Sequence, residues 1–121
     1  MVYQPKRVPL DPCPVEEVVG LIGGKWKARL LLALSLRQAR FADLRRALPG
    51  IAQQVLAVQL QALVNDGLVM REAPLQGAGG LYALTQTGLS LLPVMKCVAA
   101  WGESRLCERG EVWMQRSAAA S

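Results

Sequence analysis

The chain has 121 residues, of which 52% are hydrophobic, and its formal net charge is +5. This length supports one hydrophobic core, and the apolar fraction favours a folded domain over a disordered chain. No apolar run approaches the ~20 residues of a membrane helix, and residues 1–12 lack the apolar segment of a secretory signal. Three cysteines at unrelated spacings form no disulfide framework. We therefore expect a cytoplasmic protein with reduced thiols and no membrane partner.

Catalytic and metal-binding motifs are missing from the sequence. It has no histidine and no CxxC pair, which argues against a zinc site or histidine-based catalysis. GLIGGKWK (20–27) has the glycines and lysine of a phosphate-binding loop. However, the pattern G-x-x-x-x-G-K-[ST] places Val19 at its first glycine and Trp26 at its hydroxyl position. We expect no metal, no cofactor and no enzymatic activity.

Positive charge is concentrated in one part of the chain. Seven basic residues and a single acidic one, Asp43, lie between Lys25 and Arg46. A local basic surface is typical of proteins that bind a polyanion such as DNA. An ordinary solvated surface is the alternative interpretation.

The first two predicted helices follow a proline-rich segment. Residues 1–12 are expected to form a flexible arm. Pro14 suits the first turn of a helix, and Gly23–Gly24 suits its end. A second helix is predicted over Lys25–Leu36, in which Trp26 either anchors the core or faces DNA.

The next two helices form a pair. FADLRRAL predicts a helix over Phe41–Leu48, and Pro49–Gly50 predicts a turn. A further helix is predicted over Ala52–Asp66, with its apolar face formed by Leu56, Leu60 and Leu63.

The hydrophobic period then changes from that of a helix to that of a strand. Leu68–Ala73 and Leu81–Leu84 are predicted to form a β-hairpin. Thr85 is the expected cap of a long last helix, which Pro93 should kink or restart. The predicted domain spans residues 13–108, and residues 109–121 form a tail.

These elements predict a mainly α fold with a small β-hairpin, the winged helix-turn-helix. The second helix of the pair lies in the DNA major groove in such folds, and the hairpin forms the wing. The last helix is more apolar than one small domain can bury, so we expect a homodimer through the N- and C-terminal helices. The expected interface residues are Val15, Val18, Val94, Val98 and Trp101. A two-fold dimer would bind a palindromic operator in double-stranded DNA.

Five segments resemble the HxlR family of bacterial winged-helix regulators, which are relatives of the MarR group. They are CPVEEVVGLIGGKWK (13–27), RFADLRRALPGI (40–51), LQALVNDGLV (60–69), YALTQTG (82–88) and SLLPVMKCVAAWGES (90–104). The resemblance implies a dimeric, cytoplasmic transcription regulator, often a repressor. Several members sense oxidants or electrophiles, which makes such a small molecule an expected partner here.

The resemblance places the sensing residue in the CP motif, at Cys13. A thiol just ahead of a helix lies at the positive end of its dipole, which favours the thiolate. The alternative for Cys13 is a small apolar residue packed at a dimer contact. We expect Cys97 in the core, whereas Cys107 could serve as a partner across the dimer.

The predicted recognition helix departs from the family pattern. Ala52 occupies the N-cap position where relatives carry serine, and no Lys or Arg occurs between Arg46 and Arg71. Glutamine can still read adenine, while phosphate contacts would have to come from the surrounding basic residues. The candidate DNA-binding residues are Lys25, Arg40, Arg45, Arg46, Gln53, Gln54, Ala57, Val58, Gln61 and Arg71. The alternative for the glutamines is a solvated helix face.

The sequence therefore predicts a sequence-specific DNA-binding regulator, a repressor that responds to oxidants or electrophiles through Cys13. The alternative is a winged-helix dimerisation or protein-interaction module in which DNA binding has weakened. The uncharged recognition helix motivates that alternative.

Overall fold

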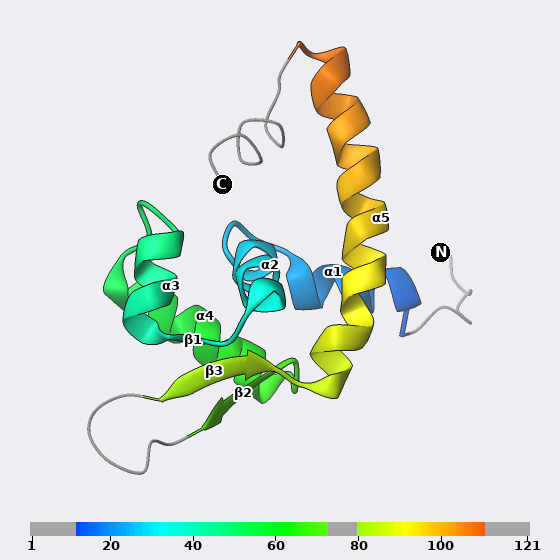
Figure 1. The fold of residues 1–121 in the computed structure, drawn as a ribbon. Helices are drawn as coiled ribbons and strands as arrows, with labels where there is room; N and C mark the ends of the chain where they lie inside the picture. Colours follow the sequence, from blue (N-terminus) through cyan, green and yellow to red (C-terminus); the bar gives the residue numbers. More distant parts are fainter. Residues whose placement is uncertain (1–11, 73–79, 111–121) are drawn as a thin grey trace, which may run out of the picture.

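The computed structural model describes residues 12–72 and 80–110, and these form a mainly helical domain with a small sheet (Figure 1). The fold class predicted from the sequence is confirmed. The elements in chain order are α1 (Pro14–Ile22), α2 (Lys27–Leu36), β1 (Ala39–Arg40), α3 (Phe41–Ala47), α4 (Gln53–Asn65), β2 (Val69–Glu72), β3 (Leu81–Leu84) and α5 (Gln86–Glu108). Within the described residues, this order matches the sequence prediction except for β1.

Helix α1 begins and ends where proline and glycine predicted. Cys13 is its N-cap and Pro14 its first residue, where the missing proline N–H costs no helical hydrogen bond. The chain leaves the helix at Gly23, whose N–H donates to the Val19 carbonyl at 2.7 Å. Gly24 then adopts φ = 85°, a left-handed conformation that glycine reaches without steric cost. Gly24 therefore provides backbone freedom for the turn between α1 and α2.

Helix α2 begins two residues later than predicted. Lys25 lies in the preceding turn, and Trp26 is the N-cap of a helix that starts at Lys27. The Trp26 side chain is half-buried and packs against the core. Lys25 and Trp26 belong to the turn that follows Gly24, so the helix begins only after them.

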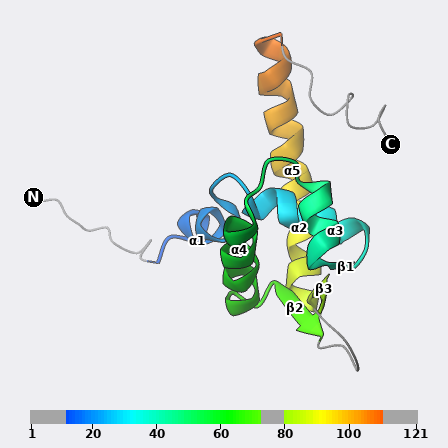
Figure 2. The same cartoon turned by 90° about the vertical axis from the view of Figure 1, so that its left-hand side faces the viewer.

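Helices α3 and α4 form the predicted helix-turn-helix pair. Gly50 in the turn between them has φ = 91°. Leu56, Leu60 and Leu63 of α4 are at most 1% exposed, as their spacing predicted. Gly67, with φ = 80°, then turns the chain from α4 into β2. The strands of the wing therefore continue directly from the C-terminal end of α4 (Figure 2).

The sheet contains one strand that the sequence did not predict. Its strand order is β1-β3-β2 with both pairs antiparallel, and Arg40 lies opposite Leu81. Residues 39–40 lie between the predicted helices Lys25–Leu36 and Phe41–Leu48. A two-residue strand has no hydrophobic period to detect, and it exists only because β3 lies beside it.

Helix α5 is capped by Thr85, as predicted. The Thr85 hydroxyl accepts a hydrogen bond from the Gly88 N–H at 3.0 Å and donates one to the Gly67 carbonyl at 2.6 Å. Helix α5 then runs through Pro93 without interruption, so the prediction that Pro93 restarts the helix is wrong. Leu91 and Met95 are buried on either side of Pro93, and this packing holds both segments in one helix.

One hydrophobic core unites the helices and the sheet. Its members are Leu30, Leu31, Leu34, Leu44, Leu48, Ile51, Leu56, Leu60, Leu63, Leu68, Val69, Leu84, Leu91 and Met95. Cys97 is exposed on α5, so its expected place in the core is wrong. The chain buries the α5 face formed by Leu91 and Met95, and two residues further along the helix Cys97 points elsewhere.

The N-terminus of α4 lacks a side-chain cap, which generates a stability prediction. Ala52 is the N-cap, with φ = −74° and ψ = 149°, a backbone conformation that serine also adopts at this position. Ala52→Ser should raise the free energy of unfolding by about 1 kcal/mol, because its hydroxyl can accept from a free N–H of the first turn. Urea denaturation monitored by circular dichroism measures this change.

Ala57→Ser is the matched control, because it places the same side chain at an exposed interior position of α4. There serine should lower stability by about 0.5 kcal/mol through its weaker helix propensity. Equal effects of the two substitutions would contradict a capping role for position 52.

Candidate nucleic-acid interface

The exposed face of α4 is the centre of the candidate site. Packing of its three leucines against the core leaves the opposite side in solvent, where Gln54, Val58 and Gln61 lie. Gln53 and Ala57 flank that side, and all five predicted base-contacting residues are exposed. At 100° per residue they occupy an arc of roughly 140°. They are Gln53, Gln54, Ala57, Val58 and Gln61. The face carries amide and apolar groups but no charge.

A short chain of amides lies along this face. The Gln61 side-chain N–H donates to the side-chain amide oxygen of Asn65 at 3.0 Å. Asn65 was not among the predicted site residues, although its spacing of four from Gln61 on one helix face signals such a contact. The bond orients Gln61 and leaves its own carbonyl oxygen and second N–H available.

Helix α3 supplies exposed positive charge beside the pair's turn. Arg40, Arg45 and Arg46 are all exposed. One carboxylate oxygen of Asp43 pairs with the Arg46 guanidinium, and the other accepts from the backbone N–H of Arg40, the N-cap of α3, at 3.1 Å. Ala42, Arg45 and Arg46 line a surface hollow of about 330 Å³. Such a hollow with two guanidinium groups can receive a phosphate.

The wing contributes Arg71, which is also exposed. A Cβ atom on Gly80 would lie 2.8 Å from Arg71 Nε and 2.9 Å from its Cγ, so the Arg71 side chain lies across Gly80. Gly80 is therefore a positioning residue that sequence reasoning missed. Residues 73–79, which connect the two strands of the wing, lie outside the described residues.

Lys25 lies apart from Arg71. The turn between α1 and α2 lies above the strands of the wing in both views (Figures 1 and 2). The Lys25 ammonium stands 4.9 Å from the centre of the Trp26 ring, and the Arg29 guanidinium stands 5.5 Å from it. Of the predicted cations, Arg45 and Arg46 lie together on α3 and Arg40 precedes that helix, while Lys25 and Arg71 lie on other elements.

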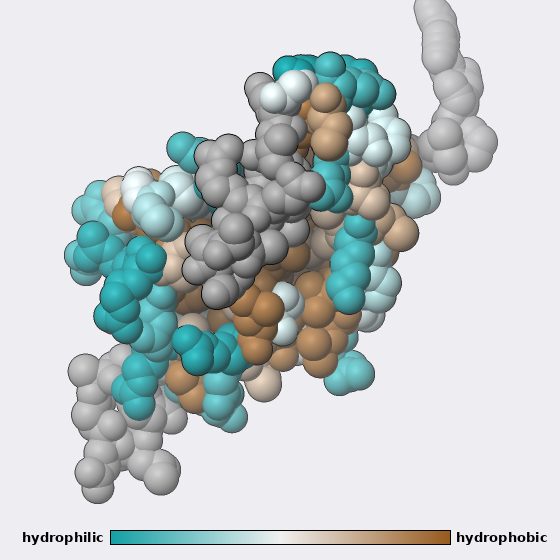
Figure 3. All heavy atoms as spheres, turned by 45° about the horizontal axis from the view of Figure 1, so that its top comes forward, coloured by the Kyte–Doolittle hydropathy of each residue, from teal (hydrophilic) through white to brown (hydrophobic). Residues whose placement is uncertain are grey.

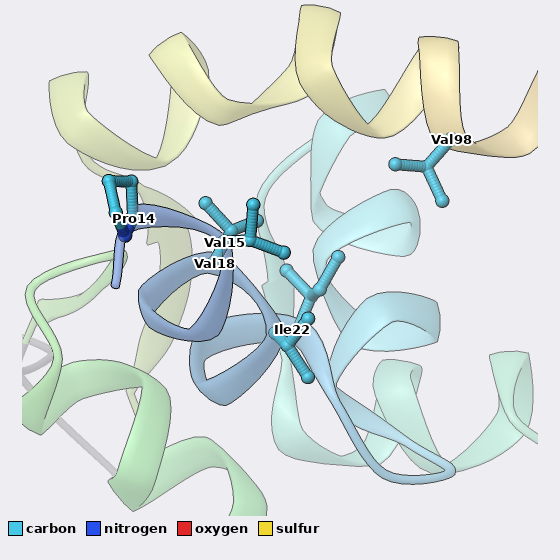
Figure 4. Close-up of a pocket in the computed structure, with 6 residues that line it drawn as sticks. Pro14, Val15, Val18, Ile22 and Val98 are labelled. Carbon is cyan, nitrogen blue, oxygen red and sulfur yellow. The ribbon is translucent and has the colours of Figure 1, made fainter. Parts of the chain in front are cut away.

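An apolar groove separates α1 from α5. It measures about 470 Å³ and is lined by Pro14, Val15, Val18, Val19, Ile22 and Val98. Val15, Val18 and Ile22 project from α1 toward α5, and Val98 projects back toward α1 (Figure 4). The lining contains the predicted interface residues Val15, Val18 and Val98, together with Val19 and Ile22.

Apolar side chains reach the surface around this groove. Val15 is 68% exposed, Val98 52% and Trp101 70%, and Val94 is also exposed. Val18, by contrast, is half-buried and packs partly against the chain's own core. Figure 3 shows apolar side chains gathered in one area of the molecular surface among hydrophilic ones. This much exposed apolar area is typical of an interaction surface.

The three cysteines differ in their surroundings. Cys13 is half-buried at the N-cap of α1 and precedes Pro14, which lines the groove. Cys97 and Cys107 are exposed on α5, and all three thiols are free. In the part of the chain that the structure describes, no helix has the length and apolar character for crossing a membrane.

Comparison with known proteins identifies the family. The model of the HxlR-like helix-turn-helix family matches residues 21–110. The chain is 41% identical over 94 residues to the uncharacterized HTH-type transcriptional regulator YdeP of Bacillus subtilis, covering 77% of this chain and 73% of YdeP.

Solved structures show the same relationship. The reduced form of the redox regulator HypR is similar with a TM-score of 0.71 and 40% identity, covering 75% of this chain and 91% of that one. Reduced YodB from B. subtilis has a TM-score of 0.72 and 29% identity, covering 82% and 98%. YodB has also been solved after diamide treatment and with bound quinone, and HypR in an oxidized form.

These relatives are transcriptional regulators and not enzymes, as the sequence predicted. The fold, the helix-turn-helix pair and the family match agree. The chain belongs to the HxlR-like helix-turn-helix family of transcriptional regulators.

Proposed function

We propose that this regulator is a cytoplasmic homodimer that binds a palindromic operator and represses transcription. The observation that carries sequence-specific binding is the exposed face of α4, which presents only uncharged groups beside the arginines of α3. Base reading and phosphate binding are divided between the two helices in this proposal. Deleting the gene for this protein should then raise transcription from the promoter that the operator controls. A fall in that transcription would indicate an activator.

The groove between α1 and α5 supports the dimer. Leaving its valines and Trp101 in water is unfavourable, because each apolar Å² withdrawn from water contributes about 25 cal/mol. A second copy presents the same apolar surface, so a two-fold contact would cover both. The upper part of α5 extends beyond the rest of the domain, where a partner could reach it (Figure 1).

Cys13 is the proposed sensor of an oxidant or electrophile. Its place at the N-cap of α1, next to the groove, would couple its modification to the dimer contact. Support comes from the similarity to HypR, described as a redox regulator, and to YodB, solved with bound quinone.

A second candidate is a dimerisation or protein-interaction module with weakened DNA binding. The uncharged face of α4 favours it, because phosphate contacts supply much of the affinity of DNA-binding proteins. The first prediction below separates the two functions.

Arg45→Ala combined with Arg46→Ala should weaken binding to all DNA duplexes alike. Loss of two phosphate contacts should also reduce the slope of log K against log salt by about 2. Mobility shifts with the upstream intergenic DNA at several salt concentrations measure both effects.

Lys96→Ala is the matched control, because Lys96 is exposed on α5 and lies roughly 140–160° around the helix from Val94, Val98 and Trp101. It should leave DNA affinity unchanged. Absence of specific binding by the wild type at low salt would favour the interaction module instead.

Val98→Glu should weaken the dimer at least about 10-fold, because dimer formation would bury an unpaired carboxylate in the apolar groove. Analytical ultracentrifugation measures the dissociation constant. Val58→Glu on α4 is the control, since Val58 is 63% exposed and far from this groove in the sequence. A monomeric wild type, or equal weakening by both variants, would refute the proposed interface.

Cys13→Ser should abolish the response of DNA binding to diamide, which takes up two electrons and two protons as it joins the Cys13 thiol to a second thiol in a disulfide. Cys97→Ser is the control and should respond as the wild type does, because Cys97 is exposed on α5 and is not among the residues that line the groove. Mobility shifts before and after treatment measure the response. If Cys13→Ser responded like the wild type, Cys13 would not be the sensor.

A further inference from the structure

We propose that α4 selects A·T base pairs, with Gln54 and Gln61 reading adenine and Val58 contacting the thymine methyl group. This inference rests on the proposed DNA-binding function and names the class of operator it recognises. It concerns the half-site segment that α4 would meet in the major groove.

Helix α4 carries no charged side chain that could recognise a G·C pair. Residues 53–65 contain no Lys, Arg, Asp or Glu. Guanine is read mainly by the paired donors of Arg or Lys, and the cytosine amino group by a carboxylate. Helix α4 therefore carries neither of the groups that favour G·C pairs.

Gln54 and Gln61 project from the same side of α4. Gln54 and Gln61 lie within roughly 20° of each other around the helix and about 10.5 Å apart along it. A helix that lies in the major groove can present both side chains to base edges of the same half-site. The amide of glutamine matches adenine, donating to N7 and accepting from the N6 amino group. The two glutamines can thus meet two adenines within one half-site.

A hydrogen bond to Asn65 orients the side chain of Gln61. One of its N–H groups is held by the Asn65 oxygen at 3.0 Å. Its second N–H and its carbonyl oxygen remain available, and these are the two groups that adenine requires. The Asn65 bond therefore preorganises Gln61 without consuming its reading capacity.

The same face of α4 also exposes apolar side chains. Val58 is 63% exposed and lies roughly 40° around the helix from Gln54, with Ala57 also exposed. The thymine C5 methyl is the apolar group that the major groove presents. Contact with this methyl would bury Val58, which the fold itself leaves in water.

The test begins with the full-length protein and a duplex library carrying a randomised core, selected at low salt. The expected result is a palindromic site. It should carry A·T pairs at the positions where substitutions in α4 change the base preference. Gln54→Ala should reduce discrimination at one such position by about 5- to 150-fold. Arg45→Ala should lower affinity for every sequence alike and leave the preference unchanged.

Modified bases then examine each contact separately. Replacing the selected adenine by 7-deazaadenine, which lacks the N7 acceptor, should weaken wild-type binding by about 3- to 10-fold and leave Gln54→Ala unaffected. Replacing thymine by deoxyuridine removes only the methyl group and should weaken the wild type about 4-fold, with no effect on Val58→Ala.

Two results would overturn the inference while the proposed function stands. One is a selected site with G·C pairs at the positions that depend on α4. The other is equal sensitivity of the wild type and the α4 variants to the modified bases. Failure to select any sequence at low salt would instead refute the DNA-binding function itself.

Discussion

The packing of three leucines of α4 against the core is the constraint on which the candidate site depends. Leu56, Leu60 and Leu63 are at most 1% exposed, and each such side chain contributes about 1.5–3 kcal/mol when fully buried. Rotating α4 about its axis would return them to water. The core therefore determines which residues α4 presents, and the amide and apolar face is the necessary complement of the leucine face.

Stability and recognition use separate groups in this domain. The described core residues are all hydrophobic, while the ten candidate DNA-binding residues are all exposed. The proposed recognition also separates roles, with α3 and the wing carrying positive charge and α4 carrying none. This arrangement makes base preference and salt dependence independently adjustable by substitution.

The apolar groove between α1 and α5 is lined by side chains that the fold leaves partly in solvent. Val98, Val15 and Trp101 stay in solvent although other apolar side chains of the same helices are buried or half-buried. Cys13 sits at the start of α1, beside this groove. In the proposed mechanism, a modification there would act through the dimer contact and so through the spacing of the two α4 helices on DNA.

The sequence by itself determined the helices, the hairpin and the family, because these depend on local signals. Pro14, Gly24 and Thr85 mark helix ends, and the leucines of α4 repeat with the helical period. The tertiary structure decided what depends on contacts between distant residues. β1 forms only because β3 lies beside it. Helix α5 stays continuous through Pro93 because Leu91 and Met95 are both packed. Cys97 is exposed because α5 packs against the core through the face that carries Leu91 and Met95. The position of Arg71 across Gly80 and the bond that orients Gln61 are likewise products of the fold, since such contacts require side chains to be placed in space.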